Sequence, residues 1–517
     1  MSTDASTEIE SDVPASSPTG LTDRAMHGLA WTMGANLVQA VLQLAVVAVL
    51  ARLIDPRDFG LLASAMVVIG VAQLVSEFGI SAGVVQSPTL TTRFERAAFS
   101  ISVLLGLGAT AALLLAAYPA EALFRMEGLA PVIQVLAIAY LLKAIAAVPE
   151  GLLQRRLQLR RLALIQISAY VVGYAAVGIS AAASGMGVFA LVLAQLGRAG
   201  IEAAAVIALA PHARRPLFGP ESRDVLRYGG GLTAAKIANY VALQGDFFVV
   251  GRGLGPTALG LYHRAYQLMA MPATFYGKAV DKAIFPAMSM VQAEKGRLLQ
   301  ACRRGEAVTA LLAIPTGVFV FVLAPEIVHT LLGPDWIRAI PPLQVLALTL
   351  YFRVGYKVNG SMIRALGAVN ALAWRQLVYA ILVVGGAWLA LPYGITGVAA
   401  AVSFAVIVQY VMLARLSASL LDAPWRDMFP ALIPASLLAG LVALVALPLV
   451  PVLRRFDLPP FAILAIAGAA SAGSALVAAR RFPDRFLGEH GAWWLDRLSR
   501  KRKQGAAGAL DAEQPSR

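Results

Sequence analysis

Residues 51–65 read ARLIDPRDFGLLASA, and residues 251–265, which lie 200 positions later, read GRGLGPTALGLYHRA. The identical pairs are Arg52/Arg252, Pro56/Pro256, Gly60/Gly260, Leu61/Leu261 and Ala65/Ala265. These matches exceed the roughly one identity that chance would give over such a window. Each copy joins the first two long apolar segments of one half of the chain. We therefore interpret the chain as two repeats of one folding unit.

Around both copies, the chain consists of apolar segments that are long enough to cross a bilayer as helices. We expect about fourteen such helices, at 28–52, 59–84, 96–119, 129–152, 162–184, 187–210, 228–251, 258–288, 305–332, 340–363, 369–391, 394–419, 428–451 and 460–479. Six helices separate the two copies, an even number, so both halves have the same orientation, as in transporters with parallel repeats. The predicted organisation is an N-terminal lobe (28–210), a cytoplasmic linker (211–227), a C-terminal lobe (228–420) and two further helices (421–480).

The composition supports a membrane protein. Of 517 residues, 59% are hydrophobic and 14% are charged, and the mean hydropathy is +0.71. A soluble chain has about 45–50% apolar and about 25% charged residues, so a water-soluble globular enzyme is excluded. Long unbroken apolar runs favour helices over a β-barrel, whose strands alternate. The predicted fold class is an all-α integral membrane protein with two pseudo-symmetric six-helix lobes and two extra C-terminal helices.

The net charge of +14 indicates membrane topology rather than nucleic-acid binding, because lysine and arginine collect in cytoplasmic loops. Basic residues follow the second, fourth, sixth and eighth helices, whereas the intervening loops contain few or none. This alternation predicts that both termini are cytoplasmic. Arg454 and Arg455, after the thirteenth helix, do not fit the alternation.

The two ends of the chain differ from its centre. Residues 1–27 are rich in serine, threonine and acidic residues, and we expect them to be disordered. The tail, residues 481–517, has Trp493 and Trp494 among charges and ends its basic run at Lys503. This pattern predicts an interfacial helix held to anionic lipids, and a partner-binding helix is the alternative.

Charged residues inside the predicted spans form the candidate site, because such residues usually face a cavity. The basic members are Lys143, Arg198, Lys236, Arg264, Lys278, Lys282, Arg353 and Lys357. The acidic members are Glu77, Glu202, Asp246 and Asp281. The excess of basic residues favours an anionic substrate, especially a phosphate. Alternatively, pairs such as Lys278 with Asp281, or Arg198 with Glu202, neutralise each other and hold helices together.

No arrangement typical of catalysis or of a cofactor is visible. The histidines lack metal-ligand spacing, and Gly251, Gly253 and Gly255 follow a predicted membrane helix instead of a strand, so a dinucleotide fold is not indicated. The lone Cys302 excludes an internal disulfide. We therefore expect neither an enzyme nor a metal site.

Four stretches together resemble a known family. They are LGPTALGLYHRAYQL (254–268), AIFPAMSMVQ (283–292), LLGPDWIRAIPPLQVLAL (331–348) and ARLIDPRDFGLLASAMVV (51–68). Over roughly residues 20–480 the chain is similar to the polysaccharide transporter family of the MOP flippase superfamily, specifically to Wzx-type exporters related to the colanic acid exporter. The resemblance implies a V-shaped pair of six-helix bundles around a cationic cavity. It also implies a substrate, undecaprenyl-pyrophosphate-linked oligosaccharide, that crosses the bacterial inner membrane.

The expected function is that of a flippase for exopolysaccharide, capsule or lipopolysaccharide O-antigen biosynthesis, working by alternating access of the lobes. Its partners would be the lipid-linked oligosaccharide, the bilayer, and the polymerase and export machinery of the same pathway. Coupling to H⁺ or Na⁺ would involve Glu77, Asp246 or Asp281. The alternatives are a peptidoglycan-precursor flippase, a multidrug antiporter of the same superfamily and, less well supported, an integral-membrane polysaccharide polymerase.

Overall fold

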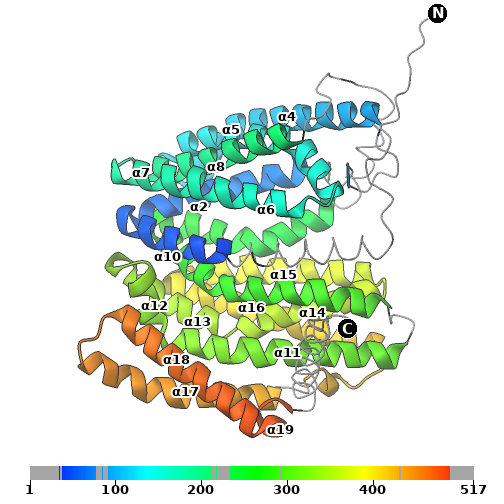
Figure 1. The fold of residues 1–517 in the computed structure, drawn as a ribbon, viewed down its shortest axis with the longest axis vertical. Coiled ribbons are helices and arrows are strands. Elements are labelled where there is room, and N and C mark those ends of the chain that lie inside the picture. The colour runs from blue at the N-terminus through cyan, green and yellow to red at the C-terminus, as the bar shows by residue number, and fades with distance from the viewer. Residues whose placement is uncertain are drawn as a thin grey trace, which may run out of the picture. The chain divides into compact units, whose positions relative to one another are not determined.

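The computed structural model describes residues 34, 38–76, 84–85, 91–210, 217, 233–290, 294–429 and 432–488. Within these ranges, the side chains of 74–76, 233–238, 277–287, 289–290 and 427–428 are not described. The described residues form helices and their connections and contain no strand (Figure 1). The predicted disordered segment 1–27, the linker 211–227 apart from Leu217, and the tail after Gly488 lie outside the described residues.

Nine helices of the described part are long and apolar enough to cross a membrane. They are α4 (Thr92–Phe124), α5 (Leu129–Arg155), Leu159–Ala183 (α6, η1 and α7), α8 (Val188–Leu209), α11 (Lys295–Val322), α15 (Val369–Leu389), Leu391–Leu420 (η4 and α16), α17 (Leu432–Arg455) and α18 (Pro460–Arg481). Each overlaps one of the predicted spans. The all-helical membrane class is therefore confirmed, and the count of fourteen stays a prediction.

The remaining helices are shorter or only partly described. They are Val38–Leu53, α2 (Pro56–Ser76), α10 (Thr233–Met290), α12 (Ala324–Leu331), η3 (Pro334–Ala339), α13 (Ile340–Ala347), α14 (Leu350–Ala365), η5 (Trp425–Met428) and α19 (Pro483–Phe486). α2 begins with proline at its first position, where no backbone N–H is needed, and Asp58 in its first turn suits the positive end of the helix dipole.

α10 joins two predicted spans, 228–251 and 258–288, into one helical run of 58 residues. The run is interrupted at Gly255, whose backbone angles are φ 83° and ψ 178°. Pro256 disfavours the α conformation for the residue before it, and glycine adopts a positive φ without steric cost. The Gly255-Pro256 pair therefore produces a kink instead of a loop.

Two other predicted spans are each divided in the structure. The predicted span 305–332 corresponds to the C-terminal part of α11 followed by α12, and α11 begins ten residues earlier than expected, at Lys295. The predicted span 340–363 is divided into α13 and α14, with a break at Leu348 and Thr349.

The described chain separates into two compact units, and the division falls inside α10 after Leu261. Unit 1 comprises residues 1–261 and 331–335, and unit 2 comprises 262–330 and 336–517. In unit 1, α4 packs on α5 and α5 packs on α8, around a core that includes Ile101, Val148 and Val206. In unit 2, α11 packs against α14 and α17, and α16 packs against α14 and α15.

Within unit 1, the first copy of the sequence repeat lies against residues 251–261, the part of the second copy that belongs to this unit. A Cβ atom at Gly60 would lie 1.8 Å from the carbonyl oxygen of Pro256, and one at Gly260 would lie 1.8 Å from the carbonyl oxygen of Pro56. The same Cβ atoms would lie 3.0 and 3.1 Å from the backbone nitrogens of Gly260 and Gly60 respectively. The contact is therefore nearly symmetric, and only glycine fits at both positions. The repeat first recognised as a sequence match is also a packing contact.

Candidate functional site

The candidate site is built on α14 in unit 2. With about 3.6 residues per turn, Tyr351, Gly355 and Asn359 fall on one face of this helix, and Arg353 and Lys357 fall on the opposite face. The first face packs on α11 and α16, since a Cβ atom at Gly355 would lie 2.7 Å from the Tyr410 ring. The second face carries the predicted cationic residues.

Arg353 is buried, with 7% of its surface exposed. Its Nη1 donates a hydrogen bond of 2.6 Å to the hydroxyl of Tyr266, and its Cζ lies 4.8 Å from the centre of the Tyr266 ring. The hydroxyls of Tyr262, Tyr356 and Tyr379 are also within electrostatic range. The guanidinium therefore contacts one tyrosine and interacts electrostatically with three more.

Two donors of Arg353, Nε and Nη2, are buried and have no hydrogen-bond partner among the residues that the structure describes. An unsatisfied buried donor of a charged group is costly, on the order of 1–3 kcal/mol or more. The guanidinium fork matches phosphate and carboxylate oxygens in a bidentate geometry. Arg353 is therefore arranged to receive an anion.

Two further predicted basic residues are described in unit 2. Lys357 is half-buried, one turn after Arg353 on the same face of α14. Arg264 is 5% exposed, and its Nη1 donates to the Oε1 atom of Gln267. Arg353 and Lys357 thus lie on one face of α14.

The predicted residues in unit 1 are separate from this group. Lys143 is exposed on α5, near Glu150. Arg198 and Glu202 lie 4.0 Å apart on α8 with i,i+4 spacing, so the internal salt bridge considered for them is present. Asp246 is 2% exposed, and its Oδ1 accepts from the backbone N–H of Phe247 at 3.0 Å.

The other members of the predicted set are Glu77, Lys236, Lys278, Asp281 and Lys282. Glu77 lies outside the described residues, and the side chains of the other four are not described. Their place in a cavity stays a prediction.

A further acidic residue, Glu306 on α11, is buried but is not among the predicted site residues. The predicted span 305–332 has Glu306 as its second residue, next to basic Arg303 and Arg304. In the structure α11 starts at Lys295, which places Glu306 three turns inside the helix, with 1% of its surface exposed. The sequence signal that could have identified it is a single acidic residue in the amphipathic segment that precedes the apolar part of α11.

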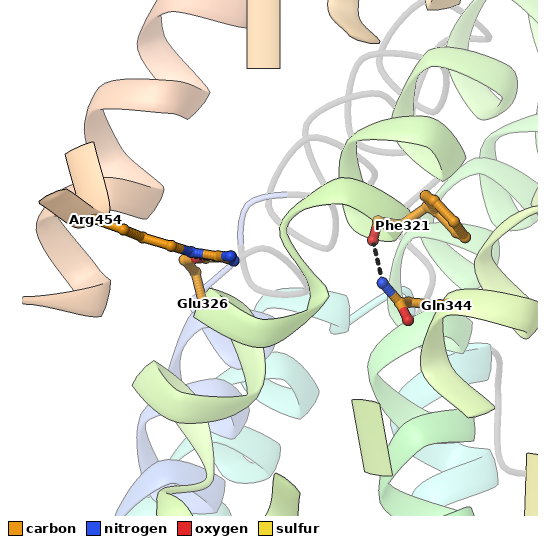
Figure 2. A network of polar contacts seen from close by, with 4 residues as sticks. All are labelled: Phe321, Glu326, Gln344 and Arg454. Carbon is orange, nitrogen blue, oxygen red and sulfur yellow. Dashed lines mark hydrogen bonds and ion pairs between the residues drawn. The ribbon is translucent and has the colours of Figure 1, made fainter. Parts of the chain in front are cut away.

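The structure also accounts for Arg454, which did not fit the charge alternation. Its Nη2 lies 2.5 Å from Oε1 of Glu326, and its Nε donates to the same oxygen at 2.7 Å. Figure 2 shows Arg454 of α17 reaching Glu326 of α12, and Gln344 of α13 donating to the Phe321 carbonyl of α11. Arg454 thus neutralises a carboxylate that is 4% exposed. Both residues also line an open cavity of about 520 Å³, together with His329 and Asp457.

Comparisons with known proteins agree on the family. The family described as "Polysaccharide biosynthesis protein" matches residues 49–341. The chain is 25% identical to the lipopolysaccharide biosynthesis protein WzxC of Escherichia coli (strain K12), over 68% of this chain and 72% of that protein. It is 24% identical to the succinoglycan biosynthesis transport protein ExoT of Rhizobium meliloti (strain 1021), over 71% of this chain and 74% of that protein.

The fold is similar to a solved structure of the lipid II flippase MurJ in an inward closed conformation. The TM-score is 0.71 at 13% identity, and the match covers 88% of this chain and 99% of that chain.

These findings define the class as an all-helical, multi-pass membrane protein with the fold of the MurJ structure. Within this class, the chain belongs to the polysaccharide biosynthesis protein family, since the family match covers more than half of its length. The resemblance inferred from residues 51–68, 254–268 and 283–292 is confirmed.

Proposed function

We propose that the protein flips undecaprenyl-pyrophosphate-linked oligosaccharide repeat units across the bacterial inner membrane. The translocated units feed exopolysaccharide, capsule or lipopolysaccharide O-antigen biosynthesis, in keeping with the names of the two relatives. The two lobes alternate access to a cationic cavity that takes up the pyrophosphate and the sugars, while the prenyl tail remains in lipid. Both termini are cytoplasmic in this proposal.

The observation that carries the proposal is Arg353. A buried guanidinium with two vacant donors is suited to a pyrophosphate oxygen pair, which would satisfy both Nε and Nη2. The surrounding tyrosines present rings and hydroxyls, which suit stacking and hydrogen bonding to sugars. A cationic drug would be repelled at this site, which disfavours the multidrug alternative.

Lys357 extends the cationic face by one turn, and Arg264 is a second buried cation of unit 2. Lys236, Lys278 and Lys282 complete the proposed set in the C-terminal lobe. Arg198 is less suited to substrate because Glu202 already neutralises it, and the exposed position of Lys143 does not favour a buried cavity.

The test compares Arg353→Ala with a matched arginine variant, Arg375→Ala. Arg375 lies on the next helix, α15, and donates to the carbonyl of Ala371 in its own helix at 2.9 Å, so it is not expected to bind substrate. Each variant replaces the wild type in a strain lacking the gene, and lipid-linked repeat units on the cytoplasmic face are quantified.

Arg353→Ala is expected to slow translocation roughly tenfold or more, because a charge-assisted contact contributes about 1.5–3 kcal/mol. Arg375→Ala should translocate at the wild-type rate, and both variants should be inserted in normal amounts. Wild-type translocation by Arg353→Ala would remove the support for this site. Accumulation of a peptidoglycan precursor in the deletion strain would favour the peptidoglycan alternative instead.

A further inference from the structure

Glu306 lies at the centre of a polar cluster inside unit 2, away from the cationic face of α14. Tyr351 of α14 donates to its Oε2 at 2.9 Å, and Tyr410 of α16 approaches the same oxygen at 3.3 Å. Asn359, two turns after Tyr351, donates its Nδ2 to Oε1 at 2.6 Å. All four residues are buried, with between 0% and 3% of their surface exposed. Three helices therefore meet at one carboxyl group.

The hydrogen atoms of this cluster can be counted. Glu306 Oε2 and the hydroxyl oxygens of Tyr351 and Tyr410 form a closed triangle, since the two hydroxyls are 2.5 Å apart. Two hydroxyl groups supply two hydrogens, but the triangle has three oxygen–oxygen contacts. A third hydrogen, on the carboxyl group, completes it. The geometry therefore suits a protonated Glu306.

The surroundings of the carboxyl group agree with a neutral acid. No cationic side chain contacts Glu306 among the described residues of unit 2. An ionised carboxylate in an apolar interior without a cation is strongly unfavourable. Glu326, which is also buried, is paired with Arg454 and provides the contrast.

A proton fits this site better than a metal ion. Cations require several oxygen acceptors around a central space. Here the two hydroxyls contact each other directly, and Asn359 presents its amide nitrogen, which also donates to the Gly355 carbonyl at 3.3 Å. The neighbours of the carboxyl are thus two hydroxyl groups, which can donate or accept, and one amide nitrogen, and they do not form the set of oxygen acceptors that a metal ion needs.

Among the described residues, the ionisable groups recorded beside Glu306 are the hydroxyls of Tyr351 and Tyr410 and, one turn earlier on α11, the thiol of Cys302. Three other elements pack on α11. α13 has no ionisable side chain, and α17 has only Arg454 and Arg455, in its last turn. η5 has an exposed arginine, Arg426, and also Asp427. A change in the protonation of Glu306 therefore acts first on the two tyrosines.

α14 links this cluster to the candidate anion site. Tyr351 and Arg353 are two residues apart, which corresponds to about 200° around a helix, so they project from opposite sides of α14. We propose that Glu306 is a proton-binding residue that couples transport to the proton gradient through α14, an inference that rests on the proposed function.

In the conformation described here the carboxyl carries the proton. Release breaks the Oε2–H bond and transfers the proton to water admitted between the helices. The carboxylate that remains attracts both tyrosine hydroxyls, so the contact between them is lost. Because Tyr351 moves with α14, Arg353 on its other side changes position relative to a bound anion.

The first test needs no substrate. Infrared spectra of the purified full-length protein in lipid vesicles at neutral pH should contain the carbonyl stretch of a protonated carboxyl group. That band should be absent in Glu306→Gln and present in Glu326→Gln, the matched control. Tyr410→Phe keeps the carboxyl group but removes one hydroxyl that contacts it, so the band should shift. The assignment of the band to Glu306 then does not depend on the folding of Glu306→Gln alone. Identical spectra for wild type, Glu306→Gln and Tyr410→Phe would overturn the proposal.

The second test measures transport of a prenyl-pyrophosphate-linked oligosaccharide into vesicles under an imposed pH gradient. The wild-type rate should change by up to about tenfold per pH unit for one coupled proton, and Glu306→Gln should not respond. Glu326→Gln should respond like the wild type. A wild-type rate that ignores the gradient would overturn the coupling. If the wild type does not transport at all, the proposed function fails, while the infrared result still decides whether Glu306 binds a proton.

Discussion

Replacing Gly60 with alanine should open the contact between the two copies of the repeat in unit 1. The new Cβ atom would lie 1.8 Å from the Pro256 carbonyl oxygen, whereas ordinary contact begins at 3.4 Å. The two segments must therefore separate by about 1.6 Å at this point. The opposing atom belongs to the backbone next to a proline ring and cannot rotate away, so the separation has to involve α2 or α10 as a whole.

The expected cost follows from two opposing effects. Overpacking a tight contact destabilises a fold by about 1–3 kcal/mol. Because the neighbour of the new Cβ atom is rigid backbone, the overpacking cost of Gly60→Ala should be at the upper end, about 3 kcal/mol. Alanine in a helix is favoured over glycine by about 1 kcal/mol, which offsets part of that cost. The net loss in the free energy of unfolding should be about 2 kcal/mol.

Gly108→Ala is the matched control, because a Cβ atom at this position in α4 has nothing within 4 Å. It should gain up to about 1 kcal/mol from helix propensity alone. Denaturant unfolding of the purified full-length chain would compare the two variants, which should differ by about 3 kcal/mol. Gly260→Ala should resemble Gly60→Ala, and the double variant should lose less than the sum, because one separation relieves both clashes. Equal stability of Gly60→Ala and Gly108→Ala would refute the described packing.

Three further outcomes are expected. Arg454→Ala should lower the free energy of unfolding by about 1.5–3 kcal/mol, since the buried Glu326 loses its partner, while Arg455→Ala should have no measurable effect in the same unfolding assay. Cys302 should resist maleimide labelling in the folded protein and react after denaturation, because its thiol is fully buried; rapid labelling of the native chain would contradict this. Reporter fusions at Gln158 should give a cytoplasmic signal and fusions at Gly185 a periplasmic one, and the opposite result would invert the predicted orientation.

Much of the candidate site could be anticipated because helical spacing alone decides which residues share a face. Arg353 and Lys357 are four residues apart, so any helix through this region places them together. Their chemical environment could not be anticipated in the same way. The contact of Arg353 with Tyr266 joins α14 to α10, 87 positions earlier in the chain, and no local pattern specifies that pairing.

The roles of Glu306 and Arg454 could not be predicted for the same reason, because their contacts are not specified by a local pattern. Glu306 is next to the start of the predicted span 305–332, whereas α11 begins at Lys295. Hydropathy does not determine where a helix begins when its first turns are basic. Arg454 appeared to break the topology rule, since its partner Glu326 is 128 positions away. In both cases the role of a charge depends on what it contacts, and that contact is made by other helices.

The sequence by itself determined the membrane class, most of the described helices and the family. These follow from hydropathy, from helical periodicity and from residue identities, which are local properties of the chain. Tertiary structure alone decided that Gly60 and Gly260 lie against each other, that Arg353 has two vacant donors, and that Glu306 meets Tyr351 and Tyr410. Such facts depend on which helix packs beside which. In lipid, where every membrane helix presents a similar apolar surface, close packing and a few buried polar contacts make that choice.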